Sequence, residues 1–197
     1  MPSTLAPMAS DDASITAAAL AAKAGDRAAA AAFVELTQPS VRRFLAHLCD
    51  PGDVDDLTQE TYLRALPALR RFAARSTART WLLAIARRVA VDHVRTAVRR
   101  PRPASLDARP EAAPTPAPLR AAGVDEGVAL RRLLDTLVPE RREAFIATQV
   151  LGLSYAEAAE VCGCPVGTIR SRVARAREDL VAAYRGDRVR QADTGVR

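Results

Sequence analysis

Residues 153–177, LSYAEAAEVCGCPVGTIRSRVARAR, carry the signals that decide the fold of the C-terminal part of the chain. Ser154 is a good N-cap residue, and Glu157 three positions later completes a capping box at the start of a helix. Gly163 can end that helix, because glycine adopts a positive φ without strain. A second helix is expected after Pro165, since apolar residues then recur on one helix face. These apolar residues are Ile169, Val173, Ala176 and Leu180.

Two short helices joined by a glycine turn, the second of them basic, predict a DNA-binding helix-turn-helix. The second helix of this motif enters the major groove, where residues near its N-terminus meet base edges. The candidates for base edges are Val166, Thr168, Arg170 and Ser171, and the candidates for phosphates are Arg172 and Arg175. An ordinary helical hairpin with a solvated basic face is the alternative. The capping box, the glycine turn and the basic helix occur together, and this combination favours DNA binding.

A proline-rich stretch separates this region from the rest of the chain. Six of the 13 prolines lie within residues 101–118, and each removes a hydrogen-bond donor and fixes its own φ. No helix can cross such a stretch, which therefore predicts a flexible linker. The predicted segments are a disordered N-terminus (1–13), an N-terminal helical domain (14–96), the linker (97–124), a C-terminal helical domain (125–186) and a tail (187–197).

The composition favours helices. Hydrophobic residues make up 49% of the chain but aromatic residues only 4%, so a core must consist mainly of Ala, Leu, Val and Ile. Alanine and leucine lose little conformational freedom in a helix. Residues 14–96 show no strand-like alternation of any length. We therefore predict an all-α protein with two small helical domains.

The net charge of +6 and the pI of about 10.0 indicate an anionic partner, nucleic acid first and a membrane surface second. Lys23 is the only lysine, and arginine suits phosphate and guanine better, although a GC-rich genome explains the bias equally well. The alanine-rich residues 17–33 are interrupted by Lys23, Asp26 and Arg27, so they can neither span a bilayer nor act as a signal peptide. We expect a cytoplasmic protein without membrane insertion.

The N-terminal domain has an acidic segment followed by a basic one. Residues 50–60 contain five acids and no base, and Asp53 can cap a helix that starts there. Residues 70–100 contain nine arginines against one acid, Asp92, which gives a net charge of +8. An acidic surface repels DNA and suits a protein partner. A well-capped, solvated helix start explains the acids equally well.

A helix is expected over residues 79–96, with Trp81 on its apolar face. A lone tryptophan at helical spacing is more often a core residue than a base-stacking one, so we expect Trp81 in the core. Asp92 lies four residues after Arg88 and three before Arg95, and can pair with either.

Together these residues resemble an extracytoplasmic-function (ECF) RNA polymerase sigma factor over nearly the whole chain. Three motifs carry the resemblance. Residues 53–62 (DVDDLTQETY) are similar to the segment that docks on the clamp helices of the polymerase β′ subunit. Residues 80–88 (TWLLAIARR) and 92–95 (DHVR) are similar to the −10 recognition helix, and residues 152–159 (GLSYAEAA) and 167–172 (GTIRSR) are similar to the −35 helix-turn-helix. Residues 161–167 (VCGCPVG) resemble most the sigma C branch.

The resemblance implies an alternative sigma factor that binds core RNA polymerase, at the β′ clamp helices and the β flap, and directs promoter-specific transcription initiation. The polymerase-binding set would be Asp53, Asp55, Asp56, Gln59 and Glu60. The −10 set, which captures an unstacked base near the loop of residues 72–80, would be Arg75, Ser76, Thr77, Arg79, Arg87, Arg88 and Arg95. The −35 set would be Tyr155, Val166, Thr168, Arg170, Ser171, Arg172 and Arg175. Promoter DNA is thus a partner, and an anti-sigma factor is a further partner that the resemblance raises.

Many family members carry Asn where this chain has Arg88, so the base preference there does not carry over. The alternative function is a stand-alone helix-turn-helix regulator, which would usually dimerise and would need no acidic docking surface. A thiol or zinc protein using Cys162 and Cys164 is less favoured, because the second ligand pair of a structural zinc site is missing. No glycine-rich phosphate loop or catalytic constellation occurs, so we expect neither an enzyme nor a cofactor.

Overall fold

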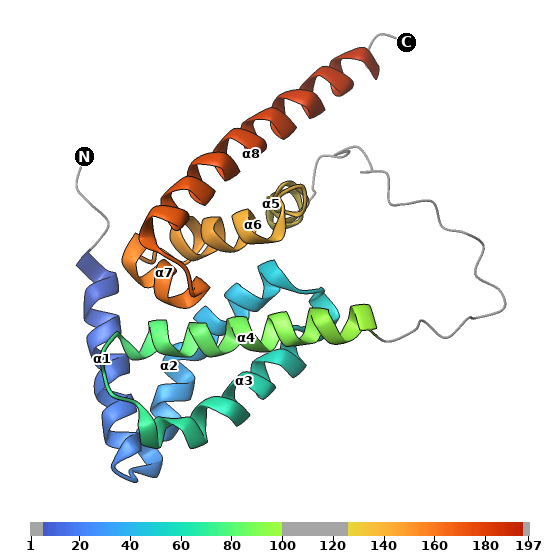
Figure 1. Cartoon of the computed structure of the whole chain (residues 1–197). Coiled ribbons are helices and arrows are strands. Elements are labelled where there is room, and N and C mark those ends of the chain that lie inside the picture. The colour runs from blue at the N-terminus through green and yellow to red at the C-terminus, as the bar shows by residue number, and fades with distance from the viewer. Residues whose placement is uncertain (1–5, 100–125, 195–197) are drawn as a thin grey trace, which may run out of the picture.

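The computed structural model describes residues 6–99 and 126–194, and within these residues every regular element is helical. The N-terminal domain contains α1 (Ala6–Lys23), α2 (Arg27–Leu48), the short turn η1 (Pro51–Asp53), α3 (Val54–Ala68), the short turn η2 (Leu69–Arg71) and α4 (Ala78–Arg99). The C-terminal domain contains α5 (Glu126–Asp135), α6 (Pro139–Phe145), the π-helical turn η3 (Ile146–Val150), α7 (Tyr155–Cys162) and α8 (Val166–Thr194). The predicted all-α class with two helical domains is confirmed (Figure 1).

Both terminal helices extend further than the sequence predicted. Residues 6–13 were expected to be disordered, but they form the start of α1. This helix has tertiary support that the sequence could not show, because Ile15 and Ala19 are buried against the bundle. At the other end, α8 continues to Thr194 through most of the predicted tail.

The predicted linker falls mostly outside the described part of the chain. Its residues 97–99 form the end of α4, and residues 100–124 lie outside the described residues. The domain boundaries therefore stay predictions.

The N-terminal domain is a bundle in which α1–α4 surround an apolar core. α2 begins where Asp26 caps it, with its side chain accepting hydrogen bonds from the backbone N–H groups of Ala28 and Ala29 at 2.8 and 3.0 Å. The largest fully buried side chains of the bundle are Phe33, Phe44, Leu45, Leu82 and Leu83. Such burial contributes about 1.5–3 kcal/mol for each large side chain.

The loop before α4 is held at both ends. The Lys23 ammonium donates a hydrogen bond to the Phe72 carbonyl at 2.7 Å, and the Thr77 hydroxyl caps α4 by accepting from the Thr80 N–H at 3.2 Å. Trp81 is half-buried and packs on Phe72, with ring centroids 5.2 Å apart. Trp81 therefore lies at the edge of the core.

The C-terminal domain contains the predicted helix-turn-helix. The Ser154 hydroxyl accepts from the Glu157 N–H at 3.2 Å, and the Glu157 carboxylate accepts from the Ser154 N–H at 2.9 Å, so the capping box is confirmed. Gly163 ends α7 with a φ of 63°, the left-handed conformation that glycine adopts readily. Ile169 and Val173 of α8 are buried beneath the motif. The local signals of residues 153–177 thus predicted the hairpin correctly.

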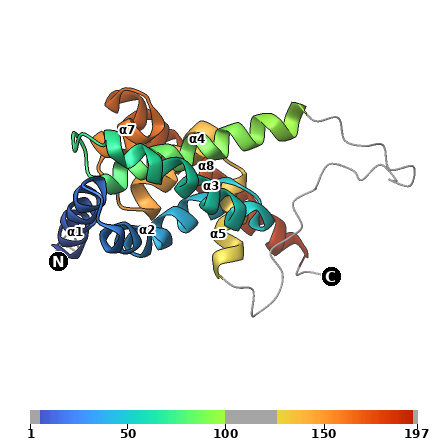
Figure 2. The same ribbon diagram turned by 90° about the horizontal axis from the view of Figure 1, so that it is seen from below.

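The two domains pack against one another. α7, the first helix of the helix-turn-helix, lies along α4 of the N-terminal domain, and both views show the two helices side by side (Figures 1 and 2). α8 rises from this contact and extends away from the N-terminal bundle (Figure 1). The contact covers one predicted DNA-binding surface and leaves the other open.

Candidate nucleic-acid and polymerase interface

The predicted −35 surface is open to solvent. Val166, Arg170, Ser171 and Arg175 of α8 are exposed, and Thr168 and Arg172 are half-buried beside them. Tyr155, at the start of α7, is 36% exposed. The structure thus brings the predicted −35 residues onto the two helices of one motif.

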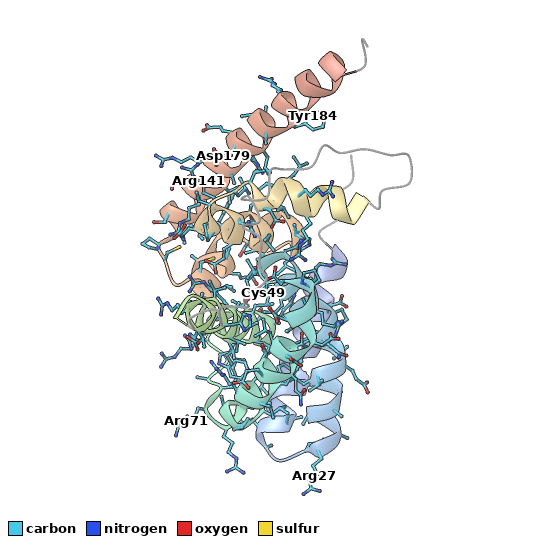
Figure 3. All side chains as sticks on the ribbon, turned by 90° about the vertical axis from the view of Figure 1, so that its right-hand side faces the viewer. Arg27, Cys49, Arg71, Arg141, Asp179 and Tyr184 are labelled. Atoms are coloured by element: carbon cyan, nitrogen blue, oxygen red, sulfur yellow. The ribbon has the colours of Figure 1, made fainter. Side chains whose placement is uncertain are left out.

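Buried contacts on the opposite side fix the direction of α8. Ile169, Val173 and Ala176 form its buried face, so the residues between them must point outward. Arg141 of α6 donates to Asp179 of α8 at 2.5 Å, and the two residues lie next to one another on the C-terminal domain (Figure 3). A rigid helix with exposed arginines and a hydroxyl near its N-terminus can read base edges and bind phosphates.

The predicted polymerase-binding residues lie on α3 and on the turn before it. Asp55, Asp56 and Gln59 are exposed, and Glu60 is half-buried. Two of these acids are paired within the domain, since Asp55 binds Arg42 and Glu60 binds Arg64 at 2.7 Å. Among the described residues Asp56 has no ion-pair partner, so it offers the least compensated charge on this surface.

Asp53 does not cap α3, contrary to the prediction. It occupies the N-cap position but its side chain makes no capping hydrogen bond. Its carboxylate instead lies 3.0 Å from Nε2 of His93 on α4, a partner 40 residues away that local capping rules do not consider. Asp92 likewise pairs with Arg64 of α3, at 2.9 Å, and not with either neighbour on its own helix.

Two exposed leucines lie next to the acidic residues on the surface of α3. Leu63 is 62% exposed and Leu66 is 39% exposed. They follow Asp56 and Gln59 at helical spacing and so lie on the same face of the helix. Sequence reasoning missed them because their spacing alone could not distinguish an exposed face from a buried one.

The predicted −10 residues are divided by the domain contact. Arg75, Arg88 and Arg95 are exposed, and Ser76 and Thr77 are half-buried. The loop that carries Arg75 also contains Ala74, whose φ of +50° is a strained conformation for a residue other than glycine.

Arg79 and Arg87, by contrast, contact the C-terminal domain. Arg79 is only 7% exposed, and it donates to the Leu151 carbonyl at 2.8 Å. Arg87 donates to the buried carboxylate of Glu143 on α6. Burial raises the pKa of Glu143, and the neighbouring Arg87 opposes that shift. The structure therefore does not bring all seven −10 candidates to one open surface.

Cys49 and Cys162 are buried, and Cys164 is half-buried. Burial, with the nearby negative charge of Glu143, raises the pKa of Cys162 to about 12, so its thiol is protonated and poorly nucleophilic at neutral pH. Within residues 6–99 and 126–194 no cluster of three metal-ligating side chains occurs. In the same part of the chain, no helix is both long enough and apolar enough to cross a membrane.

Comparisons with known proteins agree with this arrangement. Sigma-70 region 2 matches residues 33–100 and sigma-70 region 4 matches residues 127–180. The chain is 55% identical over 174 residues to the ECF RNA polymerase sigma factor SigC of Mycobacterium tuberculosis, covering 88% of this chain and 93% of that protein.

Solved structures show the same similarity. One is the structure of CnrH in complex with the cytosolic domain of CnrY, with a TM-score of 0.69 and 25% identity over 88% of this chain and 99% of that one. Another is the sigma factor RpoE of Bartonella quintana in complex with the anti-sigma factor NepR, with a TM-score of 0.60 and 30% identity over 75% of this chain and 91% of that one.

The N-terminal domain is thus a sigma-70 region 2 and the C-terminal domain a sigma-70 region 4, the two promoter-recognition modules of an RNA polymerase sigma factor. The chain belongs to the ECF family of these factors, and its expected similarity to the sigma C branch is confirmed. It is an alternative sigma factor for promoter-specific transcription initiation. The match to region 2 decides against a stand-alone helix-turn-helix regulator, which has no use for such a domain.

Proposed function

We propose that the protein acts in the cytoplasm as a non-catalytic specificity subunit that binds core RNA polymerase and reads two promoter elements with two separate surfaces. The observation that carries the proposal is the pair of surfaces itself, an exposed basic helix-turn-helix on α7–α8 and an exposed acidic face on α3. The protein needs no catalytic group, because binding energy melts the promoter and the polymerase performs the nucleotide chemistry.

The −35 element is read by α8. Arg170 would reach a guanine edge, and Arg175, five residues further along the helix, would bind a phosphate. Exposure of both side chains and burial of Val173 between them support this assignment.

Core polymerase is bound by α3. The exposed Asp56 and Gln59 would meet cationic groups of the β′ clamp helices, and Leu63 and Leu66 would supply apolar contact beside them. Region 4 would contact the β flap.

The −10 element is read by the loop before α4 and by α4 itself, after the C-terminal domain has moved away. Arg79 and Arg87 can reach DNA only when their contacts with Leu151 and Glu143 are broken. The 27 steps of chain from residue 99 to residue 126 can extend over roughly 90 Å. That reach matches the roughly 85 Å of about 25 base pairs of DNA.

A protein partner that binds both domains at once is also proposed. The two similar solved proteins, CnrH and the sigma factor RpoE, are each in complex with another protein, and for RpoE that protein is an anti-sigma factor. Such a partner would act on the same contact between α4 and α7 that this chain already makes by itself.

Run-off transcription with core polymerase and a promoter library tests the proposal. We expect transcripts that share −35 and −10 elements, and their loss in the double variant Asp55→Arg/Asp56→Arg. The exposed variant Glu35→Arg, on α2, is a matched control for charge reversal and should keep activity. Duplex binding by the protein alone as a dimer, without polymerase-dependent transcripts, would contradict the proposal.

A further inference from the structure

Arg131 of α5 reaches from the C-terminal domain to the end of a helix in the N-terminal domain. Its guanidinium donates one hydrogen bond to the Ala46 carbonyl at 2.6 Å and another to the Cys49 carbonyl. These carbonyls lie at the C-terminal end of α2, where backbone acceptors lack helical partners and a positive charge is favourable. Arg131 therefore forms a two-point contact between the domains.

The backbone that Arg131 holds leads directly into the polymerase-docking segment. Cys49 precedes Asp50, η1 and the first acids of α3, and it lies at the level where the two domains meet (Figure 3). Asp53 lies four chain steps after Cys49, a reach of at most about 14 Å. Asp53 is in turn bound to His93 of α4. The turn between α2 and α3 is thus fixed from one side by region 4 and from the other by the −10 helix.

Charges on both sides of this turn act on the same buried group, the Cys49 thiol. Burial raises the pKa of the Cys49 thiol to about 11, with further raising by Asp53 and Asp50 and an opposing effect of Arg131. A docked protein with cationic side chains would add positive charge at the start of α3, just after the backbone that Arg131 binds. Like charges separated by no more than the Debye length, about 8 Å at physiological salt, repel one another.

We propose that Arg131 is a latch that couples polymerase docking to the release of the C-terminal domain. With Arg131 bound to Ala46 and Cys49, region 4 stays on α4 and covers Arg79 and Arg87. Docking of a cationic surface on α3 weakens that contact and frees the −10 residues. Because the coupling is reciprocal, the factor by which docking weakens the latched state is also the factor by which the latched state weakens docking. This inference rests on the proposed docking role of α3.

Two other contacts between the domains involve α4 and not the docking turn. Glu143 binds Arg87 in the middle of α4, and Leu151 binds Arg79 near its start. Removing one of these contacts loosens the closed arrangement without touching the backbone that leads into α3. Variants at these contacts therefore distinguish a residue that couples closure to docking from a residue that only stabilises the closed arrangement.

The test measures two properties of the full chain, hydrogen exchange of α4 and α7, and affinity for core RNA polymerase. Arg131→Met removes the charge and the donors but keeps much of the side-chain length. We expect faster exchange at the contact and an affinity about fivefold or more higher. Arg131→Lys keeps the charge and should give a smaller effect on both. Arg132→Met, at the exposed neighbouring position, should change neither. Glu143→Gln should speed exchange with a smaller gain in affinity.

Each failure has a distinct meaning. Unchanged exchange in Arg131→Met would overturn the latch, and so would faster exchange with wild-type affinity. An equal gain in affinity from Glu143→Gln and Arg131→Met at equal exchange would also overturn it, because closure alone would then explain the effect. If the wild-type protein does not bind core polymerase, the proposed function fails and the latch fails with it.

Discussion

The two DNA-binding surfaces proposed for this protein differ in their state. The helix-turn-helix presents Arg170, Ser171 and Arg175 to solvent, whereas the −10 helix has Arg79 and Arg87 bound to region 4. The same element accounts for both, because α7 belongs to the −35 motif and also lies on α4. One domain of the factor thus carries one of the proposed DNA-binding surfaces and at the same time covers part of the other.

This difference has an energetic basis. The Arg87–Glu143 pair is largely removed from water, and the cost of desolvating two charges offsets much of their attraction. Such a contact adds little net stability when both partners are present and penalises the loss of either one. It therefore suits an arrangement that must be specific and also able to open.

Replacing Glu143 is expected to have the largest effect on the covered surface. Glu143→Ala leaves Arg87 without its partner, which costs about 3–5 kcal/mol if the charge stays buried. Arg87 escapes that cost when region 4 moves away. We expect the free variant to bind a single-stranded −10 oligonucleotide about tenfold or more tightly, since the competent state is more populated. Fluorescence anisotropy measures this affinity. Glu140→Ala, at an exposed site on the same helix, should bind as the wild type does.

Replacing Arg170 should affect only the open surface. Arg170→Ala removes a base contact worth about 1–3 kcal/mol, so transcription from a promoter that depends on its −35 element should fall about tenfold. Binding of the −10 strand should not change. Arg185→Ala, also exposed but further along α8, is the control. An equal loss in both variants would mean that only general positive charge matters.

Acidic pH should weaken the fold near the Arg131 contact. His47 lies in the last turn of α2, and burial, together with Arg131 and Arg43, lowers its pKa below the ordinary 6.5. As the pH falls through about 6.5, the unfolded chain takes up a proton that the folded protein resists, so stability falls. Thermal unfolding between pH 7.5 and 5.5 should show this slope, and His47→Gln should reduce it.

Buried carboxyl groups change stability in the opposite direction, at lower pH. Burial raises the pKa of Asp12 and Glu143 above their ordinary values of 3.8 and 4.5. As the pH falls toward those values the folded protein takes up a proton before the unfolded chain does, which favours folding. A melting temperature that rises as the pH is lowered from 7.5 to 5.5 would contradict the assignment of the slope to His47.

The smallest expected effect concerns the loop before α4. Ala74→Gly removes the strain of a positive φ, which costs alanine about 1–2 kcal/mol. Glycine also increases the conformational entropy of the unfolded chain, and this offsets part of the stabilisation. The melting temperature should therefore rise by a few degrees at most. Ala73→Gly, at the neighbouring exposed residue, should lower it. A fall in both variants would show that the loop gains nothing from glycine at position 74.

Local signals predicted much of the fold. Ser154, Glu157 and Gly163 act over three to six residues, and the structure confirms the capping box and the left-handed glycine that they indicated. The all-α class and the division into two domains followed from composition and from the prolines of residues 101–118. These features depend on backbone preferences that each segment carries by itself.

Contacts between distant residues could not be predicted in this way. Asp53 prefers His93 to the helix end that it was expected to cap, and Asp92 prefers Arg64 to the arginines of its own helix. The charge pattern of residues 70–100 indicated a basic surface but not that Arg79 and Arg87 bind groups 72 and 56 residues away. A charge in the sequence identifies the sign of its partner and not the partner itself.

The central claim is that region 4 covers the −10 helix in the free protein and leaves it in the polymerase complex. Spin labels can be attached at two exposed positions, Gln38→Cys on α2 and Ala174→Cys on α8, after Cys164→Ser has removed the half-buried thiol. Double electron–electron resonance then measures the distance between the two labels, and so between the domains. We predict one short, narrow distance distribution in the free protein and a longer one after core polymerase is added. A broad distribution in the free protein, or the same short distance in the complex, would contradict the account.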